Sequence, residues 1–352
     1  MMTAFVTVMR RTVYRHRRTW TWCLAIVWAC VNTWAASIPL TLATTGPGNL
    51  SHLPVDLIKR IGADRAEGVE LTVRYFGGGP LAYKDMLERN SDFAVAGAPA
   101  LAGLAAKGEP VVSVAAVNRV PTFVLMVRSD LKNRVKSVQD LRGRVIGVNS
   151  STTATKSTSQ LLAEYVLRRA GVDPLAEVNF IAAGQTLAEQ QSALDSGAVD
   201  ALMGDEPFAT QLKSEGRVYH LLDFHDPDIA RKALGGLFLN AQLATRRDVL
   251  EREPHKVERM VRVLKRTLNW IAAHSPEEIA ARLYPHDQTA RRALVATLKR
   301  HKAIYSPDGA FTREQIATAE AFFRANQPPD SPAARFAFET MIDARFAGIK
   351  PQ

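Results

Sequence analysis

Short apolar runs alternate with helical patterns along the chain from Ile38 onward. Runs rich in β-branched residues predict strands, and apolar residues three and four positions apart predict helices. The predicted strands are Ile38–Ala43, Val69–Phe76, Phe93–Ala96, Val111–Val117, Val145–Val148, Val178–Ile181 and Ala201–Met203. Helical patterns such as Pro54–Ile61 and Leu187–Leu194 lie between them. This alternation is typical of an α/β fold with largely parallel sheets.

The last third of the chain, from about Pro254, has a mostly helical pattern. One apolar face is formed by Val257, Met260, Val261, Leu264, Leu268 and Ile271. Ser275, Pro276 and Glu278 then have the spacing of an N-cap, a first helical residue and a capping-box acid. We therefore expect a second helix to begin at Pro276.

Two segments about a hundred residues apart share one plan. "MLERNSDFAVAGAP" and "ALDSGAVDALMGDEP" each read as a helix end, a polar turn, an aspartate, an apolar strand and a proline. Asp92 precedes Pro99 by seven positions, and Asp200 precedes Pro207 by seven. The repetition suggests two similar lobes; a chance resemblance of two βα units is the alternative.

Two long extended runs, Pro121–Leu131 and Gly235–Leu250, set the predicted lobe boundaries. They would carry the chain into a second lobe and back. The first lobe would then comprise residues 37–120 and 238–352, with an inserted lobe at 121–237. Small ligands usually bind between such lobes, at the carboxyl ends of the strands.

Residues 1–36 have the layout of a secretory signal peptide. Five arginines between Arg10 and Arg18 precede a short apolar stretch, Trp20–Trp34, and small residues follow it. We expect cleavage after Ala35 or Ala36 and export to the periplasm. A twin-arginine signal, a lipoprotein cysteine at Cys30 and an uncleaved anchor helix are the alternatives.

The composition excludes some classes of function for this chain. Both cysteines of the chain lie inside the predicted signal peptide, so the exported protein has no disulfide or thiolate chemistry. Half of the net charge of +10 comes from that same segment, which holds five arginines and no acidic residue. The remainder is only mildly basic and has no basic stripe interleaved with aromatic residues, so we expect no nucleic-acid partner.

A cluster of hydroxyls follows the strand Val145–Val148. Where a strand runs into a helix at a cleft, free backbone N–H groups and the positive end of the helix dipole favour an anion. The cluster would add neutral donors for a sulfonate, carboxylate, phosphate or nitrate; its members are Ser150, Ser151, Thr152 and Thr153. Alternatively, one of them caps the helix and the others are solvated.

Other loops at strand ends should face the same space. They contribute the candidate ligand-binding residues Thr45, Asn49, Gly97, Ala98, Asp205 and Glu206. The two acidic residues would bind an ammonium or hydroxyl group of a zwitterion, or would cap the helix near Pro207. Arg119 is the one strong cation that we place near the cleft, with a surface role as the alternative.

Sequence motifs for catalysis are absent. The chain has no HExxH, no GxSxG and no paired Cys/His arrangement, and its histidines lack metal-ligand spacing. We therefore expect no enzyme activity, no catalytic residue, no metal and no cofactor.

Several motifs resemble one known family. "SVQDLRGRVIGVNSSTTA", "LLAEYVLRRAGVDPLAEVNF", "ALDSGAVDALMGDEPF" and "SDFAVAGAPALAGLAAKGEPVVSVAAV" look like periplasmic substrate-binding proteins of the nitrate/sulfonate/taurine type, in the NMT1/THI5-like superfamily. "RRDVLEREPHKVERMV" also matches, and the resemblance spans most of residues 38–270.

The resemblance implies a type II periplasmic binding protein: two α/β lobes, each a mixed sheet flanked by helices, joined by a two-strand hinge. It would act as a monomer, closing on a small solute and docking onto an ABC permease in the inner membrane. The implied ligand loops are Thr45–Asn49, Gly97–Ala98, Ser150–Thr153 and Asp205–Glu206. At Gly204-Asp205 the chain lacks the aromatic residue that the family often places before Glu-Pro. A sensor for a membrane signalling partner and a thiamine-related pyrimidine-precursor binding protein or enzyme are the alternatives.

Overall fold

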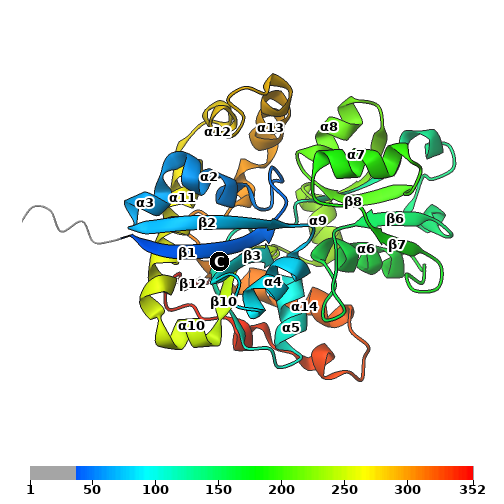
Figure 1. Cartoon of the computed structure of the whole chain (residues 1–352). Helices are drawn as coiled ribbons and strands as arrows, with labels where there is room; N and C mark the ends of the chain where they lie inside the picture. The colour runs from blue at the N-terminus through cyan, green and yellow to red at the C-terminus, as the bar shows by residue number, and fades with distance from the viewer. Residues whose placement is uncertain (1–36, 352) are drawn as a thin grey trace, which may run out of the picture. The chain divides into compact units, whose positions relative to one another are not determined.

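The computed structural model describes residues 37–351 as two five-stranded sheets with helices around each (Figure 1). In the first sheet the order is β2-β1-β3-β10-β4. Its strands are β1 (Ile38–Thr45), β2 (Val69–Phe76), β3 (Phe93–Gly97), β4 (Val111–Ala116) and β10 (Ala241–Arg246). We call this sheet and its helices the first lobe.

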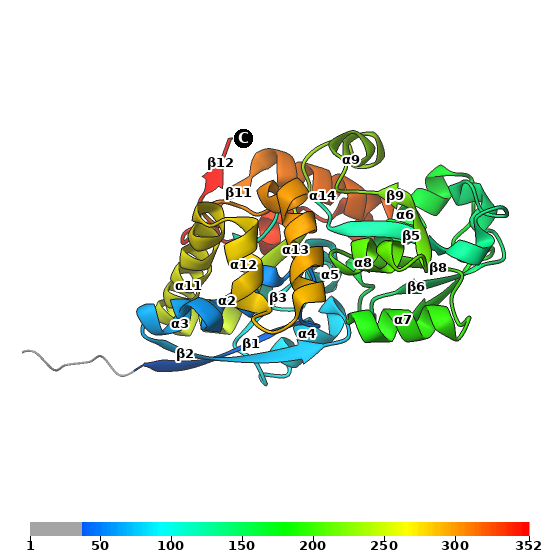
Figure 2. The same cartoon turned by 90° about the horizontal axis from the view of Figure 1, so that it is seen from above.

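The helices of the first lobe lie before and after β10 in the chain. They are α2 (Leu53–Ile61), α3 (Ala63–Ala66), α4 (Gly79–Leu87), α5 (Ala98–Ala105), α10 (Arg247–Arg252), α11 (Pro254–Ala273), α12 (Pro276–Leu283), α13 (Gln288–His301) and α14 (Arg313–Ala325). Helices α12 and α13 lie side by side (Figure 2). A two-stranded sheet joins β11 (Phe311–Thr312) to β12 (Ile349–Lys350).

The second sheet, with its helices, forms the second lobe, and its strand order is β7-β6-β8-β5-β9. Its strands are β5 (Phe123–Arg128), β6 (Val145–Val148), β7 (Asn179–Ala182), β8 (Ala201–Asp205) and β9 (Val218–Asp223). Its helices are α6 (Thr158–Arg169), α7 (Leu187–Asp195), α8 (Phe208–Ser214) and α9 (Pro227–Leu234). The chain therefore passes between the two sheets twice, after β4 and after β9.

The two repeated segments occupy the same place in the two sheets. Strands β3 and β8 are each third in order, next to a parallel neighbour. The Asp92 carboxylate accepts the N–H of Thr41 on β1 at 2.9 Å, and the Asp200 carboxylate accepts the N–H of Val145 on β6 at 3.0 Å. Each aspartate thus ties its own strand to the start or middle of the neighbouring strand, so the sequence repetition reflects a repeated structural unit.

The strand predictions agree closely with the structure. All seven predicted strands are present, and the two extended runs contain β5 and β10. Strand β9 was not predicted, because only its first residue, Val218, is fully buried and the run lacks a clear apolar alternation.

The predicted helical region near the carboxyl end is confirmed. The apolar face of α11 is buried from Val257 to Ile271, and α11 packs on α2 and α3. At the start of α12, the N–H of Glu278 donates to Ser275 Oγ at 3.2 Å, and the N–H of Ser275 donates to the Glu278 carboxylate at 2.8 Å. This is the predicted capping box.

The N-terminal prediction concerns residues outside the described part of the chain. The predicted signal peptide and both cysteines lie within residues 1–36. The lobe boundaries at 37–120, 121–237 and 238–352 also stay predictions. Among the residues that the structure describes, none of the helices combines the length and apolar character needed to cross a bilayer.

Candidate functional site

A small cavity lies between the two lobes, at the carboxyl ends of parallel strands. Thr45 ends β1, Gly97 ends β3 and Asn149 follows β6. The complete lining is Thr45, Ser51, His52, Gly79, Gly97, Ala100, Phe123, Asn149, Ser157, Thr158, Asn240 and Ala241. Its volume is about 20 Å³, which is room for roughly one water molecule. A solute larger than water therefore requires the lobes to stand slightly further apart.

The second lobe presents the first turn of α6 to this cavity. Ser157 is the N-cap, with Oγ accepting the N–H of Gln160 at 3.3 Å and donating to the carbonyl of Asn149 at 2.8 Å. Thr158 is buried, with only 7% of its surface exposed, and its Oγ1 has no hydrogen-bond partner. A buried hydroxyl without a partner is costly, so Thr158 is a donor available to a bound group.

The first lobe presents a neutral histidine. Burial lowers the pKa of His52 to about 3, so the ring carries no charge at neutral pH. Its Nδ1 lies 2.9 Å from Asn49 Oδ1 and 2.7 Å from Thr45 Oγ1. Because an amide oxygen only accepts, we assign the proton to Nδ1. The buried Nε2, which has no partner, is then an acceptor.

Asp205 joins the lobes. Its Oδ1 accepts the hydroxyls of Ser51 at 2.8 Å, on the first lobe, and of Thr122 at 3.0 Å, on the first crossing segment. Burial raises the pKa of Asp205 to about 6, and these hydroxyls and the Asn149 amide moderate that rise. The bond to Ser51 thus exists only while the lobes are together.

Glu206 is also buried, and its side chain belongs to the next helix. Its carboxylate accepts the N–H and the hydroxyl of Thr210 at 3.0 and 2.8 Å. These bonds satisfy a free donor in the first turn of α8. Glu206 thus has the helix-capping role that the sequence analysis gave as the alternative to solute binding. The Glu206 carbonyl accepts the N–H of Leu50 at 2.5 Å, a further contact between the lobes.

The hydroxyl cluster after β6 lies beside the cavity. The N–H of Ser150 donates to the Gly77 carbonyl of the first lobe at 2.9 Å, and Ser151 Oγ donates to Gln160 at 2.8 Å. Thr152 bonds to Thr155, and both Thr152 and the exposed Thr153 line a separate hollow next to α14. Helix α6 begins only at Thr158, so Ser157 and Thr158 occupy the helix start that the sequence analysis placed at 150–153.

Three other predicted residues have clear positions. Asn49 is buried and its amide donates across the lobes to Gln185 at 3.3 Å. Ala98 N–H donates to the Asn240 carbonyl at 2.7 Å. Arg119 donates from Nη2 to the Ala303 carbonyl at 3.0 Å, and it does not line the interlobe cavity.

The cavity lining contains no lysine, arginine or ionised acid. Recognition there must use neutral donors and acceptors together with the positive end of the α6 dipole. No group of three or more metal-ligating side chains gathers anywhere in the described residues 37–351.

Comparison with known families decides the classification. A family model described as NMT1/THI5 like matches residues 65–279, more than half of the chain. The chain belongs to the NMT1/THI5-like family.

Solved structures similar to this NMT1/THI5-like chain have the same fold. A protein from Bordetella bronchiseptica RB50 is 22% identical with a TM-score of 0.80, covering 88% of this chain and 96% of its own. The alkanesulfonate-binding protein SsuA from Xanthomonas axonopodis pv. citri, bound to MOPS, is 16% identical with a TM-score of 0.68, covering 88% and 99%. The periplasmic nitrate-binding protein NrtA from Synechocystis PCC 6803 is 11% identical with a TM-score of 0.68, covering 87% and 86%. No curated protein sequence matches.

These similarities establish the two-lobed fold of periplasmic binding proteins for this family member, with a mixed five-stranded sheet in each lobe. The sequence analysis missed Ser157 and Thr158, although a signal was present. Ser157-Thr158-Ser159-Gln160 has the capping-box spacing and directly precedes the first apolar pair of α6, Leu161 and Leu162.

Proposed function

We propose that this protein is the solute-binding component of an ABC importer. It would bind a small anionic or zwitterionic solute between its lobes and deliver that solute to a permease. It would act in the periplasm after export through residues 1–36, as a monomer and without catalysis. The fold and the family support this role. Their solved relatives include a protein named as alkanesulfonate-binding and one named as nitrate-binding.

The observation that carries the ligand class is the unpartnered hydroxyl of Thr158 at the start of α6. It is a buried donor beside free backbone N–H groups, and it lines the interlobe cavity. A helix N-terminus favours negative charge, and hydroxyl and N–H donors suit an oxoanion. The anionic group of the solute would therefore bind at the Thr158 hydroxyl and the first turn of α6.

The opposite wall favours a hydrogen-bond donor on the solute. His52 Nε2 lies in the first lobe, has no hydrogen-bond partner and carries no positive charge. An ammonium or hydroxyl group would satisfy the His52 acceptor. This arrangement supports a zwitterion such as an aminosulfonate, and it also accommodates a small oxoanion bound with water.

A thermal-shift panel tests the proposal. Taurine, alkyl and aryl sulfonates, nitrate, aromatic carboxylates and pyrimidines are added to the purified protein. A solute present at a hundred times its Kd should add about 2.7 kcal/mol to the free energy of unfolding. Stabilisation by none of the anions or zwitterions would contradict the proposed ligand class.

Thr158→Val locates the site, because valine keeps the β-branched shape and removes the hydroxyl. Loss of a hydrogen bond to a charged group is worth about 1.5–3 kcal/mol, so Kd for the best solute should rise roughly tenfold or more. Thr153→Val is the matched control, since Thr153 is exposed and lies outside the cavity. Weaker binding in Thr153→Val alone would instead support the predicted contacts at Ser150–Thr153.

A further inference from the structure

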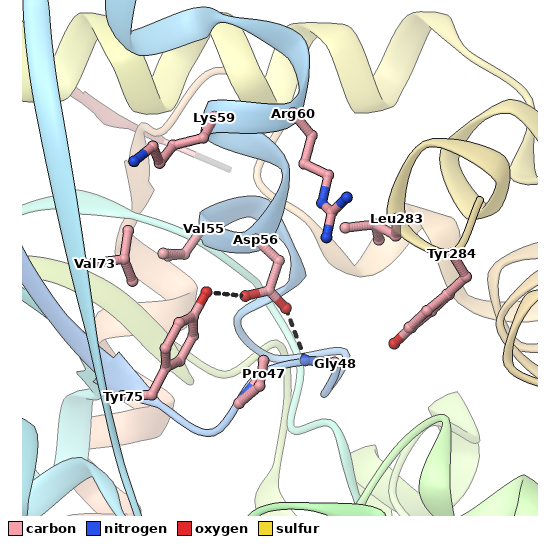
Figure 3. A pocket seen from close by; sticks show the side chains of 10 residues that line it. All are labelled: Pro47, Gly48, Val55, Asp56, Lys59, Arg60, Val73, Tyr75, Leu283 and Tyr284. Atoms are coloured by element: carbon pink, nitrogen blue, oxygen red, sulfur yellow. Dashed lines mark hydrogen bonds between the residues drawn. The ribbon is translucent and has the colours of Figure 1, made fainter. Parts of the chain in front are cut away.

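A second and larger hollow lies on the first lobe, outside the interlobe cavity. It is bounded by α2, by β2 and by the end of α12 (Figure 3), and its volume is about 660 Å³. That volume is within the usual range of small-molecule pockets, about 300–1,000 Å³. None of its lining residues lines the interlobe cavity. We call it the α2 groove.

The floor of the α2 groove holds one acid whose oxygens are both engaged. The Tyr75 hydroxyl donates to Asp56 Oδ1 at 2.8 Å, and the N–H of Gly48 donates to Asp56 Oδ2 at 2.8 Å (Figure 3). Burial raises the pKa of Asp56 to about 6, although these two bonds and Arg60 lower it. Asp56 therefore holds Tyr75 and Gly48 in place at the groove wall, and groups of the protein itself largely balance its charge.

Two cations of the groove, in contrast, make no direct contact with an acid, although Arg60 is near enough to attract the Asp56 charge. Lys59 and Arg60 are consecutive, exposed residues in the last turn of α2. Neither side chain makes a hydrogen bond or an ion pair with another residue of the described range 37–351. Basic side chains near a helix C-terminus interact favourably with the helix dipole. That interaction explains the two cations but not the pocket beside them. The groove thus has a net charge of about +1 with its positive groups unpaired, a balance that favours an anion.

The remaining walls are apolar and aromatic. They are formed by Pro47, Val55, Val73, Leu283 and the rings of Tyr75 and Tyr284. In Figure 3 the Arg60 guanidinium extends toward Leu283, and the Tyr284 hydroxyl points toward Gly48. Burial raises the pKa of Tyr284 to about 12, which keeps its hydroxyl protonated and able to donate.

A glycine permits this close approach of Tyr284. Gly48 has a φ of +85°, and a Cβ built on it would lie 2.8 Å from the Tyr284 hydroxyl oxygen. A side chain at this position would be strained and would also displace Tyr284 from the end of the groove. Gly48 therefore allows both the bond to Asp56 and the closed end of the groove.

We propose that the α2 groove is a second binding site, for a small organic anion with an apolar body. The acidic group would pair with Arg60, whose planar guanidinium matches a carboxylate or sulfonate, with Lys59 adding to the positive field. The hydrocarbon part would lie against Val73, Leu283 and the tyrosine rings. This site is separate from the interlobe cavity and does not depend on the transport role.

Fluorescence titration of the full chain with 2-naphthoate tests the proposal, with 2-naphthamide as the neutral probe of the same shape. The carboxylate should bind at least tenfold more tightly than the amide. Lys59→Gln combined with Arg60→Gln should abolish that preference. Arg65→Gln is the matched control, because Arg65 is an exposed cation on the adjacent α3 and does not line the groove.

Three results would overturn the proposal. One is equal binding of the carboxylate and the amide, and another is an unchanged preference in the double variant. The third is loss of 2-naphthoate binding in Thr158→Val, which would place the probe in the interlobe cavity. Leu283→Gln provides an independent check, since it leaves both cations in place and should weaken both probes alike. Circular dichroism of each variant confirms that it is folded.

Discussion

Gly97 is the residue at which the closeness of the two lobes is most directly tested. It ends β3 in the first lobe and faces the start of α6 in the second. A Cβ built on Gly97 would lie 1.9 Å from Thr158 Oγ1 and 3.0 Å from Thr158 Cβ. Its φ of −66° is open to alanine, so the substitution adds no backbone strain. Gly97→Ala therefore acts through contact between the lobes alone.

The expected size of the effect follows from this overlap. Overpacking a close contact costs about 1–3 kcal/mol. The clash exists only in the closed arrangement, so the closing equilibrium should weaken by roughly five- to 150-fold. The stability of the lobes themselves should change little, because the new methyl group has room once the lobes separate. Kd for the best solute of the thermal-shift panel should rise by up to the same factor, because a solute larger than water holds the lobes slightly further apart.

Two assays separate closure from folding. Small-angle X-ray scattering with and without solute should show a decrease in the radius of gyration for the wild type that Gly97→Ala lacks, while the Tm without solute stays the same. Adding Thr158→Ala removes the nearest clashing atom and should restore part of the compaction. If Gly97→Ala compacts and binds like the wild type, then the lobes do not meet in solution at Gly97 and Thr158, and the site described here is wrong.

Two further substitutions test the described electrostatics and capping. Asp205 has a pKa raised to about 6 by burial, above its ordinary value of 3.8. Between these values the unfolded chain releases the proton first, so the free energy of unfolding should fall by up to about 3 kcal/mol as pH rises from 4 to 6 and then stay level. Asp205→Asn should remove that fall in urea titrations, and equal pH profiles for the two proteins would contradict the buried carboxylate. Ser275→Ala deletes the N-cap of α12 and should lower the free energy of unfolding by about 1 kcal/mol, whereas an unchanged urea midpoint would show that the cap is dispensable.

The fold could be predicted because its signals are local. A strand such as Val145–Val148 is a buried apolar run, and Ser275 with Glu278 is a complete capping box within four residues. Strand β9 has neither kind of signal. Its residues after Val218 are half-buried, so their pattern reflects contacts with β5 rather than a periodicity of their own.

The site could be predicted only in part, because its positions depend on contacts between lobes. The strand ends at Thr45 and Gly97 line the cavity, as parallel sheets lead one to expect. The hydroxyl-rich run after β6 gave no indication of which hydroxyls point inward. That choice depends on where α6 starts, and the loop uses Ser151 to bond Gln160 and the N–H of Ser157 before the helix begins.

The acidic pair shows the same dependence on long-range contacts. Adjacent carboxylates after β8 were expected to bind a solute or to cap a helix, and the sequence offered no way to choose between them. In the structure the two side chains separate: Glu206 bonds to Thr210 in its own helix, and Asp205 bonds to Ser51, 154 residues away in the chain. The partner of Asp205 comes from the other lobe, so no pattern in the sequence around residue 205 could indicate which of the two acids would bind it.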